Sequence, residues 1–365
     1  MKSRSPLNEL SVRSYTSANL FHSGFYLSGL GELSALRNIS YSPLTLRDSR
    51  YHRADWANSD FLIQLEIESS EERFDAWIDV SDSPDHFVPE ALAAGAYYFK
   101  VNFNSNSIDR IPQAAKFRHR IIPINPGFTL MLPPFTLINL ASCNLRMNDL
   151  RLLLRAQRRQ PRIDWLRAQR TKKKKRDVHF VATYYPSKHD EQNEFRLEVM
   201  ERLQHETSIH AELGFYNVDD DAPSRFKRFA IARTSRRKHL VDIAQSRAAV
   251  YVQGPHTALS FKFGEQLALG VTVIGQKLAN NTRNLMQLAF FDEQYLADSP
   301  SDIVSNLATG LKHPDHFETV GARNARTFDE SLSPITTALN VLQPAMQVTP
   351  QELDHWEAAS VAGLN

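Results

Sequence analysis

The sequence predicts an α/β protein built from two domains, and three observations lead to this prediction. The chain has 365 residues, a length that favours two domains over one. Short runs rich in Ile, Val, Phe and Tyr alternate with helix-length segments along the chain. In the second half the order is strand, helix, strand, helix and strand, which is typical of a mostly parallel sheet covered by helices on both faces.

The first half contains six expected strands, separated by turns and short helices. Turn residues follow two of these strands, at Ser81-Asp82-Ser83-Pro84 and at Asn125-Pro126-Gly127. The strands are expected over 12–16, 38–41, 61–67, 76–80, 97–103 and 120–124, and helices over 25–36 and 88–94.

A basic junction follows the first half. Residues 137–169 are rich in helix formers and are interrupted by Pro161. From Arg146 to Arg176 the chain has thirteen Lys or Arg residues and two acidic ones, although its formal net charge is only +2. We therefore expect a first domain over 1–160, a basic linker over 161–176, a second domain over 177–335 and a helical tail over 336–365.

In the second domain the alternation restarts. Strands are expected over 178–183, 208–213, 248–252 and 271–274, and helices over 190–204, 239–246 and 261–269. The remaining helices are expected over 301–311, 315–327, 332–342 and 349–359.

Composition and missing motifs exclude several classes of protein. Apolar residues make up 42% and charged residues 23%, which is ordinary for a globular protein. The single cysteine, Cys143, excludes a disulfide framework and a zinc site of several thiolates. No apolar run reaches the length of a membrane span and no secretory signal is visible, so we expect a cytoplasmic location. The P-loop and nucleophile-elbow motifs are missing.

The segment over 248–276 carries the clearest chemistry. A buried strand ends in a Gly-Pro loop, Ser260 is a plausible N-cap of a short helix, and Gly270 ends that helix. A helix that starts beyond the carboxyl end of a strand offers free N–H groups to a phosphate. Lys262 adds a charge, and Glu265 can accept hydrogen bonds from sugar hydroxyls. The alternative is an ordinary core element in which Lys262 and Glu265 form a solvated pair.

This segment resembles the nucleotide-sugar-binding part of glycosyltransferases with the GT-B fold. The matching positions are Ser260, Lys262, Glu265, Leu267, Ala268, Gly270 and Val273-Ile274. The resemblance implies two Rossmann-like domains that face a cleft, with the donor on the second domain and Glu265 on donor ribose or sugar hydroxyls. It also assigns His256 and Phe261, which flank the motif, to donor binding. Thr257 stands where many retaining members have a second glutamate, which favours subgroups that resemble spore-coat or exostosin-like transferases.

Two further basic segments are candidates for donor binding. Ser187 and Lys188 follow the first strand of the second domain, where the resemblance implies a loop that faces the diphosphate. The segment 225–239 has seven Lys or Arg residues and no acidic one. Without a metal or another cofactor, such cations must stabilise the leaving diphosphate. The candidates are Arg233, Arg236 and Lys238, and a solvated basic loop is the alternative.

The first domain is expected to bind the acceptor. His22, Ser23 and Gly24 come soon after the first strand, and Asp82 and Asp85 follow the strand over 76–80. An inverting enzyme needs a general base, which we assign to His22 or Asp82, with Asp85 and His86 as the alternatives. Ser23, Gly24 and Asp85 are expected to contact the acceptor. A retaining enzyme would need no such base.

The resemblance therefore implies a metal-independent glycosyltransferase that moves a sugar from a nucleotide-diphosphate sugar to a glycan, a lipid-linked acceptor or another envelope acceptor. The basic stretch 146–176 is a solvated helix face or a contact with an anionic membrane surface. Nucleic acid is not expected as a partner, because aromatic residues are sparse there. A non-catalytic α/β binding protein that attaches to a membrane or nucleic acid through this stretch is the alternative, and a sugar-nucleotide epimerase of the same architecture is a third hypothesis.

Overall fold

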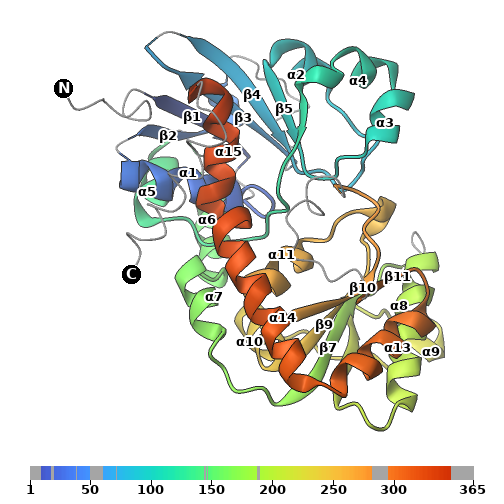
Figure 1. The fold of residues 1–365 in the computed structure, drawn as a ribbon. Coiled ribbons are helices and arrows are strands. Elements are labelled where there is room, and N and C mark those ends of the chain that lie inside the picture. Colours follow the sequence, from blue (N-terminus) through green and yellow to red (C-terminus); the bar gives the residue numbers. More distant parts are fainter. Residues whose placement is uncertain are drawn as a thin grey trace. The chain divides into compact units, whose positions relative to one another are not determined.

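A computed structural model of the chain is shown in Figure 1. It describes residues 10–17, 20–37, 39–49, 61–70, 72–143, 145, 147–186, 190–281 and 295–346. The chain forms two compact units, of which the first comprises Met1–Ile163 and Asp329–Asn365 and the second Asp164–Phe328. Each unit has its own sheet, which confirms the predicted α/β class.

The first unit contains a six-stranded sheet in the order β2-β1-β3-β4-β5-β6. The strands are β1 (Ser11–Thr16), β2 (Ser40–Thr45), β3 (Leu62–Glu68), β4 (Arg73–Asp79), β5 (Tyr97–Lys100) and β6 (Ile121–Pro123). Strand β3 is antiparallel to both of its neighbours, and the other pairs are parallel. Only four residues separate β3 from β4, which is too short for a parallel crossover. Strands β1, β2, β4, β5 and β6 consequently share one carboxyl edge.

Helices cover this sheet, and the last one comes from the far end of the chain. The helices are α1 (Gly24–Arg37), α2 (Pro89–Ala94), α3 (Ser105–Arg110), α4 (Pro112–Lys116), α5 (Pro134–Ser142), α6 (Met147–Arg159) and α15 (Pro334–Met346). Figure 1 shows α15 beside α1. The side-chain amide of Asn125 donates to the carbonyl oxygen of Ser331 at 2.8 Å and to the hydroxyl of Thr337 at 3.2 Å.

The observed boundary between the units differs from the boundary that the sequence predicts. The sequence places residues up to 335 in the second domain and 336–365 in a separate tail, whereas the chain from Asp329 onward belongs to the first unit. Apolar pattern alone gives no information about which unit a terminal helix covers. The helix expected over 349–359 lies outside the described residues.

The second unit contains a fully parallel sheet in the order β11-β10-β9-β7-β8. Its strands are β7 (Arg176–Thr183), β8 (Ala211–Tyr216), β9 (Ser246–Tyr251), β10 (Thr272–Gln276) and β11 (Leu296–Ala297). Its helices are α7 (Ile163–Gln169), α8 (Asp190–His205), α9 (Ser224–Lys227), α10 (Arg236–Ala244), α11 (Phe261–Ala268), α13 (Pro300–Leu311) and α14 (Pro314–Thr327). The predicted βαβ pattern of this half is confirmed.

The chain order of the strands reverses between β7 and β9. From β7 the chain moves to β8 on one side, and it then returns to β9 on the other side. In an open α/β sheet, ligands bind beyond the carboxyl ends of the strands at such a reversal. The topology therefore singles out the carboxyl ends of β7 and β9.

The basic junction differs from the single interrupted helix that the sequence predicts. Helices α5, α6 and α7 replace it: α5 ends at Ser142, α6 begins at Met147, and Pro161 lies between α6 and α7. The stretch after α7 is not a separate linker, because it starts the second unit. The ammonium group of Lys174, for example, donates to the carbonyl oxygen of Ala244 at 3.0 Å.

The contact between α1 and α15 generates a stability prediction for Gly29. A Cβ atom at this position would overlap the carbonyl oxygen of Pro334. In an ordinary helix interior, replacing glycine by alanine stabilises by about 1 kcal/mol. Here we expect Gly29→Ala to destabilise the protein by about 1–3 kcal/mol, because the added methyl overpacks the contact. Thermal unfolding measures the effect, and an unchanged or raised midpoint would contradict the packing of α15 on α1.

Candidate functional site

A pocket lies at the carboxyl-terminal halves of β7 and β9, where the strand order reverses. Three helices of the same unit complete it, namely α8, α10 and α11. Its polar lining residues are His179, Thr183, Tyr185, Arg196, His239, Ser260, Lys262 and Gln266. The position that the topology singles out is therefore hollow and polar.

The amino end of α11 forms one wall of this pocket. Ser260 is the N-cap, as predicted, and its side chain accepts a hydrogen bond from the N–H of Lys262 at 3.3 Å. Ser260, Phe261 and Lys262 all line the pocket. The positive end of the helix dipole favours an anion at this place.

Two basic side chains add positive charge to the pocket. The ammonium group of Lys262 donates to the carbonyl oxygen of Val181 at 2.9 Å. Burial and the nearby charge of Arg196 together lower the pKa of Lys262 to about 7. Arg196 donates to the carbonyl oxygens of Thr183 and Gln253, each at 3.0 Å, and so joins the chain after β7 to the chain after β9.

Two buried histidines also line the pocket. The rings of His179 on β7 and His239 on α10 meet edge to face, with their centroids 5.0 Å apart. Burial lowers the pKa of His179 to about 3, and it also lowers the pKa of His239 well below its usual range. Both rings are therefore neutral at physiological pH and act as hydrogen-bonding groups rather than as cations.

The predicted donor residues Arg236 and Glu265 bind each other. Glu265 is completely buried, and the Arg236 guanidinium donates to both of its carboxylate oxygens, one of them at 3.2 Å. Glu265 is not among the residues that line the pocket, whereas its neighbour Gln266 is. Gln266 lies one turn after Lys262, and this i, i+4 spacing is the sequence signal that could have identified it.

Three other predicted donor residues do not line the pocket. Arg233 and His256 are exposed. Lys238 is also exposed, and its ammonium group contacts the carboxylate of Asp242 at 2.7 Å. Ser187 and Lys188 lie outside the described residues.

In the first unit, the two predicted base candidates lie at one edge of the sheet. His22 follows β1 and Asp82 follows β4, and these strands run in the same direction. His22 is half-buried and its ring contacts those of Phe21 and Phe61, with centroids 4.8 and 5.0 Å away. Asp82 is exposed.

The predicted acceptor residues differ in their exposure. Ser23 is 1% exposed, and Gly24 is buried at the start of α1. Asp85 is exposed and its carboxylate lies 3.5 Å from the guanidinium of Arg110.

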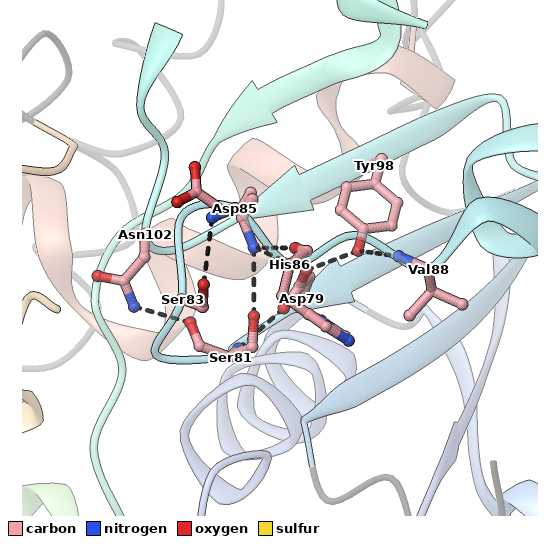
Figure 2. A network of polar contacts seen from close by, with 9 residues as sticks. Asp79, Ser81, Ser83, Asp85, His86, Val88, Tyr98 and Asn102 are labelled. Atoms are coloured by element: carbon pink, nitrogen blue, oxygen red, sulfur yellow. Dashed lines mark hydrogen bonds and ion pairs between the residues drawn. The ribbon is translucent and has the colours of Figure 1, made fainter. Parts of the chain in front are cut away.

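A buried polar network supports the loop that carries Asp82 and Asp85. Figure 2 shows its centre, the carboxylate of Asp79 at the end of β4, which accepts from the Tyr98 hydroxyl at 2.6 Å. The ammonium group of Lys100 lies 2.8 Å from the same carboxylate, and both side chains are almost fully buried. Lys100 also donates to the carbonyl oxygen of His86 at 2.9 Å.

Burial acts to raise the pKa of Asp79, but the charge of Lys100 and the hydrogen bonds hold it below its usual range. The sequence prediction missed this pair. The available signal was a lysine inside an otherwise apolar strand, since such a charge is buried only with a partner.

The described residues lack two further features. No group of three or more His, Cys, Asp or Glu residues in this part of the chain is arranged to hold a metal ion. None of the helices that the structure describes is both long and apolar enough to cross a bilayer.

No protein-family model matches the chain, and no curated protein matches it. Solved structures do match, and GT-B glycosyltransferases are among those that the chain resembles. TarM matches 71% of this chain at 9% identity and a TM-score of 0.41, and the chain spans 45% of TarM. A UDP-GlcNAc 2-epimerase from Neisseria meningitidis matches 89% of this chain and 97% of its own, at 8% identity and a TM-score of 0.39. A DNA-modifying β-glucosyltransferase matches 88% of this chain and 93% of its own, at 10% identity and a TM-score of 0.36.

The lowered pKa of Lys262 generates a prediction about anion binding. Above about pH 7 the free side chain loses its proton, whereas a bound diphosphate favours the charged form. Affinity for a nucleoside diphosphate should therefore fall by up to about tenfold per pH unit between about pH 7 and pH 9. Lys262→Arg keeps its charge and should remove this dependence. The dissociation constant measured across this range provides the test, and an equal slope in both proteins would refute the role of Lys262.

The buried pair in the first unit generates a second prediction. Replacing Lys100 by Met leaves the charge of Asp79 buried without a partner, and we expect a loss of about 3–5 kcal/mol at neutral pH. The pKa of Asp79 is lowered in the folded protein, so the pair stabilises the fold fully at pH values above the usual carboxyl pKa. This contribution disappears as the pH falls through the lowered pKa of Asp79. The penalty of Lys100→Met should thus shrink in acid.

Urea unfolding of Lys100→Met and of Lys100→Met/Asp79→Asn measures this effect. The double variant should recover part of the loss, because it removes the uncompensated charge. Wild-type stability of the single variant would show that the pair is unimportant.

Proposed function

We propose that this protein is a glycosyltransferase that binds a nucleotide-diphosphate sugar in the pocket of the second unit. One observation carries this proposal. At the strand reversal, the positive end of the α11 dipole and the side chains of Lys262 and Arg196 offer positive charge, while neutral polar groups lie beside them. A nucleotide-diphosphate sugar combines a double phosphate with many hydroxyls, which matches both kinds of group.

The same cations explain how sugar transfer is accelerated. As the bond between the anomeric carbon and the diphosphate breaks, negative charge develops on the departing oxygen. Lys262 and the positive end of the α11 dipole are positioned to stabilise that charge, with Arg196 adding its field. We therefore infer that the reaction proceeds without a metal ion, the nucleoside diphosphate being the leaving group.

The acceptor is assigned to the carboxyl edge of the first unit. In an inverting reaction an acceptor hydroxyl attacks the anomeric carbon while a base removes its proton. His22 and Asp82 are the candidate bases, since both follow strands that end at this edge. The Asp79 network supports this assignment, because it fixes the loop on which Asp82 lies.

Helix α6 suggests that the acceptor is carried on an anionic surface. Four exposed arginines lie along one face of this helix with spacings of three and four residues, namely Arg151, Arg155, Arg158 and Arg159. None of them makes an ion pair with a residue that the structure describes, whereas exposed Arg225 and Arg228 pair with glutamates of α8.

Apolar side chains accompany these arginines. Met147 and Leu152 on α6 are 62% and 61% exposed, and Ile138 on α5 is 66% exposed. Arginines beside exposed apolar side chains suit a membrane of anionic lipids, where each basic residue contributes about 1 kcal/mol. We infer a lipid-linked or envelope glycan as acceptor.

Calorimetry with UDP, GDP, ADP, CDP and dTDP tests the donor site. The wild type should bind at least one of these nucleotides, and Lys262→Met should lose about tenfold or more in affinity, because a buried charge-assisted contact is removed. Lys312→Met, which removes an exposed lysine of the same unit, should bind as the wild type does. Absence of binding by the wild type would defeat the proposal.

Activity then separates sugar transfer from epimerisation. With the matching nucleotide sugar, the product should be a glycosylated acceptor together with free nucleoside diphosphate. A nucleotide sugar with one inverted carbon, formed without any acceptor, would instead identify an epimerase.

Sedimentation with anionic vesicles tests the role of α6. Arg151→Ala/Arg155→Ala should weaken binding by about 30-fold, the equivalent of about 2 kcal/mol. Lys172→Ala/Lys173→Ala removes the same charge from the stretch after α7 and should have a smaller effect. Equal losses in both double variants would show that binding depends on net charge, and tighter binding to RNA than to vesicles would contradict a membrane role.

A further inference from the structure

The wall of the pocket carries two polar atoms that the protein itself leaves without partners. They are Nδ1 of His239 and Oε1 of Gln266, and neither forms a hydrogen bond within the described part of the chain. The two side chains are only 6% and 3% exposed. An unsatisfied buried polar group costs about 1–3 kcal/mol, so two of them in one pocket indicate groups that a ligand satisfies.

The hydrogen bonds of Gln266 fix what it offers to that ligand. Its Nε2 donates to the carbonyl oxygen of Val250 at 3.3 Å, and only the amide nitrogen can make this contact. The atom left for the ligand is therefore the amide oxygen, which is an acceptor. A phosphate oxygen cannot pair with it, but a hydroxyl can.

The ring of His239 also offers a neutral hydrogen-bonding group to the ligand. Its lowered pKa keeps the ring neutral, so that one ring nitrogen is an acceptor and the other is a donor. The ring is held between those of His179 and Tyr216, with centroids 5.0 and 5.9 Å away. Its orientation is thus set by packing before any ligand arrives.

His239 and Gln266 differ in chemistry from the amino end of α11. The helix dipole and the ammonium group of Lys262 supply positive charge at that end, which suits phosphate. We propose that His239 and Gln266 bind the hydroxyls of a sugar that is attached to this phosphate, so that the pocket selects a sugar phosphate over a bare phosphate. This inference rests on the proposed function and specifies which residues recognise the sugar.

The buried ion pair of Arg236 and Glu265 then positions the helices that carry His239 and Gln266. Arg236 is the first residue of α10 and lies one turn before His239, while Glu265 directly precedes Gln266 on α11. The ion pair joins the two helices that carry the hydroxyl-binding groups. Glu265 therefore acts through helix placement, and Gln266 takes the role of sugar contact that the resemblance assigns to Glu265.

Paired calorimetry with a nucleoside diphosphate and with inorganic pyrophosphate tests this inference. The nucleotide is whichever of UDP, GDP, ADP or CDP the wild type binds. Gln266→Ala and His239→Phe should each weaken nucleotide binding by about tenfold and change pyrophosphate binding by less than about twofold. Lys262→Met should weaken both, and Glu265→Gln should weaken both by similar factors.

The outcomes separate the two proposals. If the wild type binds a nucleotide but neither Gln266→Ala nor His239→Phe lowers its affinity, the assignment of these two residues to the sugar is wrong. The donor site of the proposed function is then still supported. If Glu265→Gln weakens only the nucleotide, Glu265 contacts the sugar directly and its positioning role is wrong. If the wild type binds no nucleotide, both proposals fall. His239→Phe keeps the ring packing, so it remains informative if Gln266→Ala does not fold.

Discussion

The site depends on one constraint of chain topology. Strand β7 lies between β8 and β9 in its sheet, and the chain leaves it for β8 on one side and later reaches β9 on the other. The connections that follow β7 and β9 therefore turn away from each other and leave the carboxyl ends of these strands uncovered. Helix α11 starts beside this opening because Ser260 caps it there. The side chains on these connections give the pocket its charge and its polar lining.

The pocket combines cationic side chains with neutral polar ones. Lys262 and Arg196 are cationic groups held by backbone carbonyl oxygens, so their positions are fixed before a ligand binds. Burial keeps the rings of His179 and His239 neutral, and the nearby charge of Lys262 adds to this effect. A preorganised site of this kind does not need to reorganise when charge develops on a leaving group.

Most strands and the start of α11 could be predicted from the sequence, because alternation, turn residues and an N-cap serine are local signals. The antiparallel direction of β3 was missed, although the four residues before β4 encode it. The ion pair of Arg236 with Glu265 and the contact between His179 and His239 join distant parts of the chain, so no spacing reveals them. The sequence analysis therefore named Arg236 and Glu265 but could not show that they bind each other.

The return of the chain to the first unit has a consequence for biosynthesis. All of Asp164–Phe328 is inserted between two segments of the same unit, and α15 supplies part of the cover of α1. During translation the second unit is complete before α15 leaves the ribosome. Until then the surface of α1 that contains Gly29 has no cover. The first unit begins synthesis earlier but therefore finishes folding later than the second. A nascent chain stopped near residue 328 would expose apolar surface that chaperones recognise.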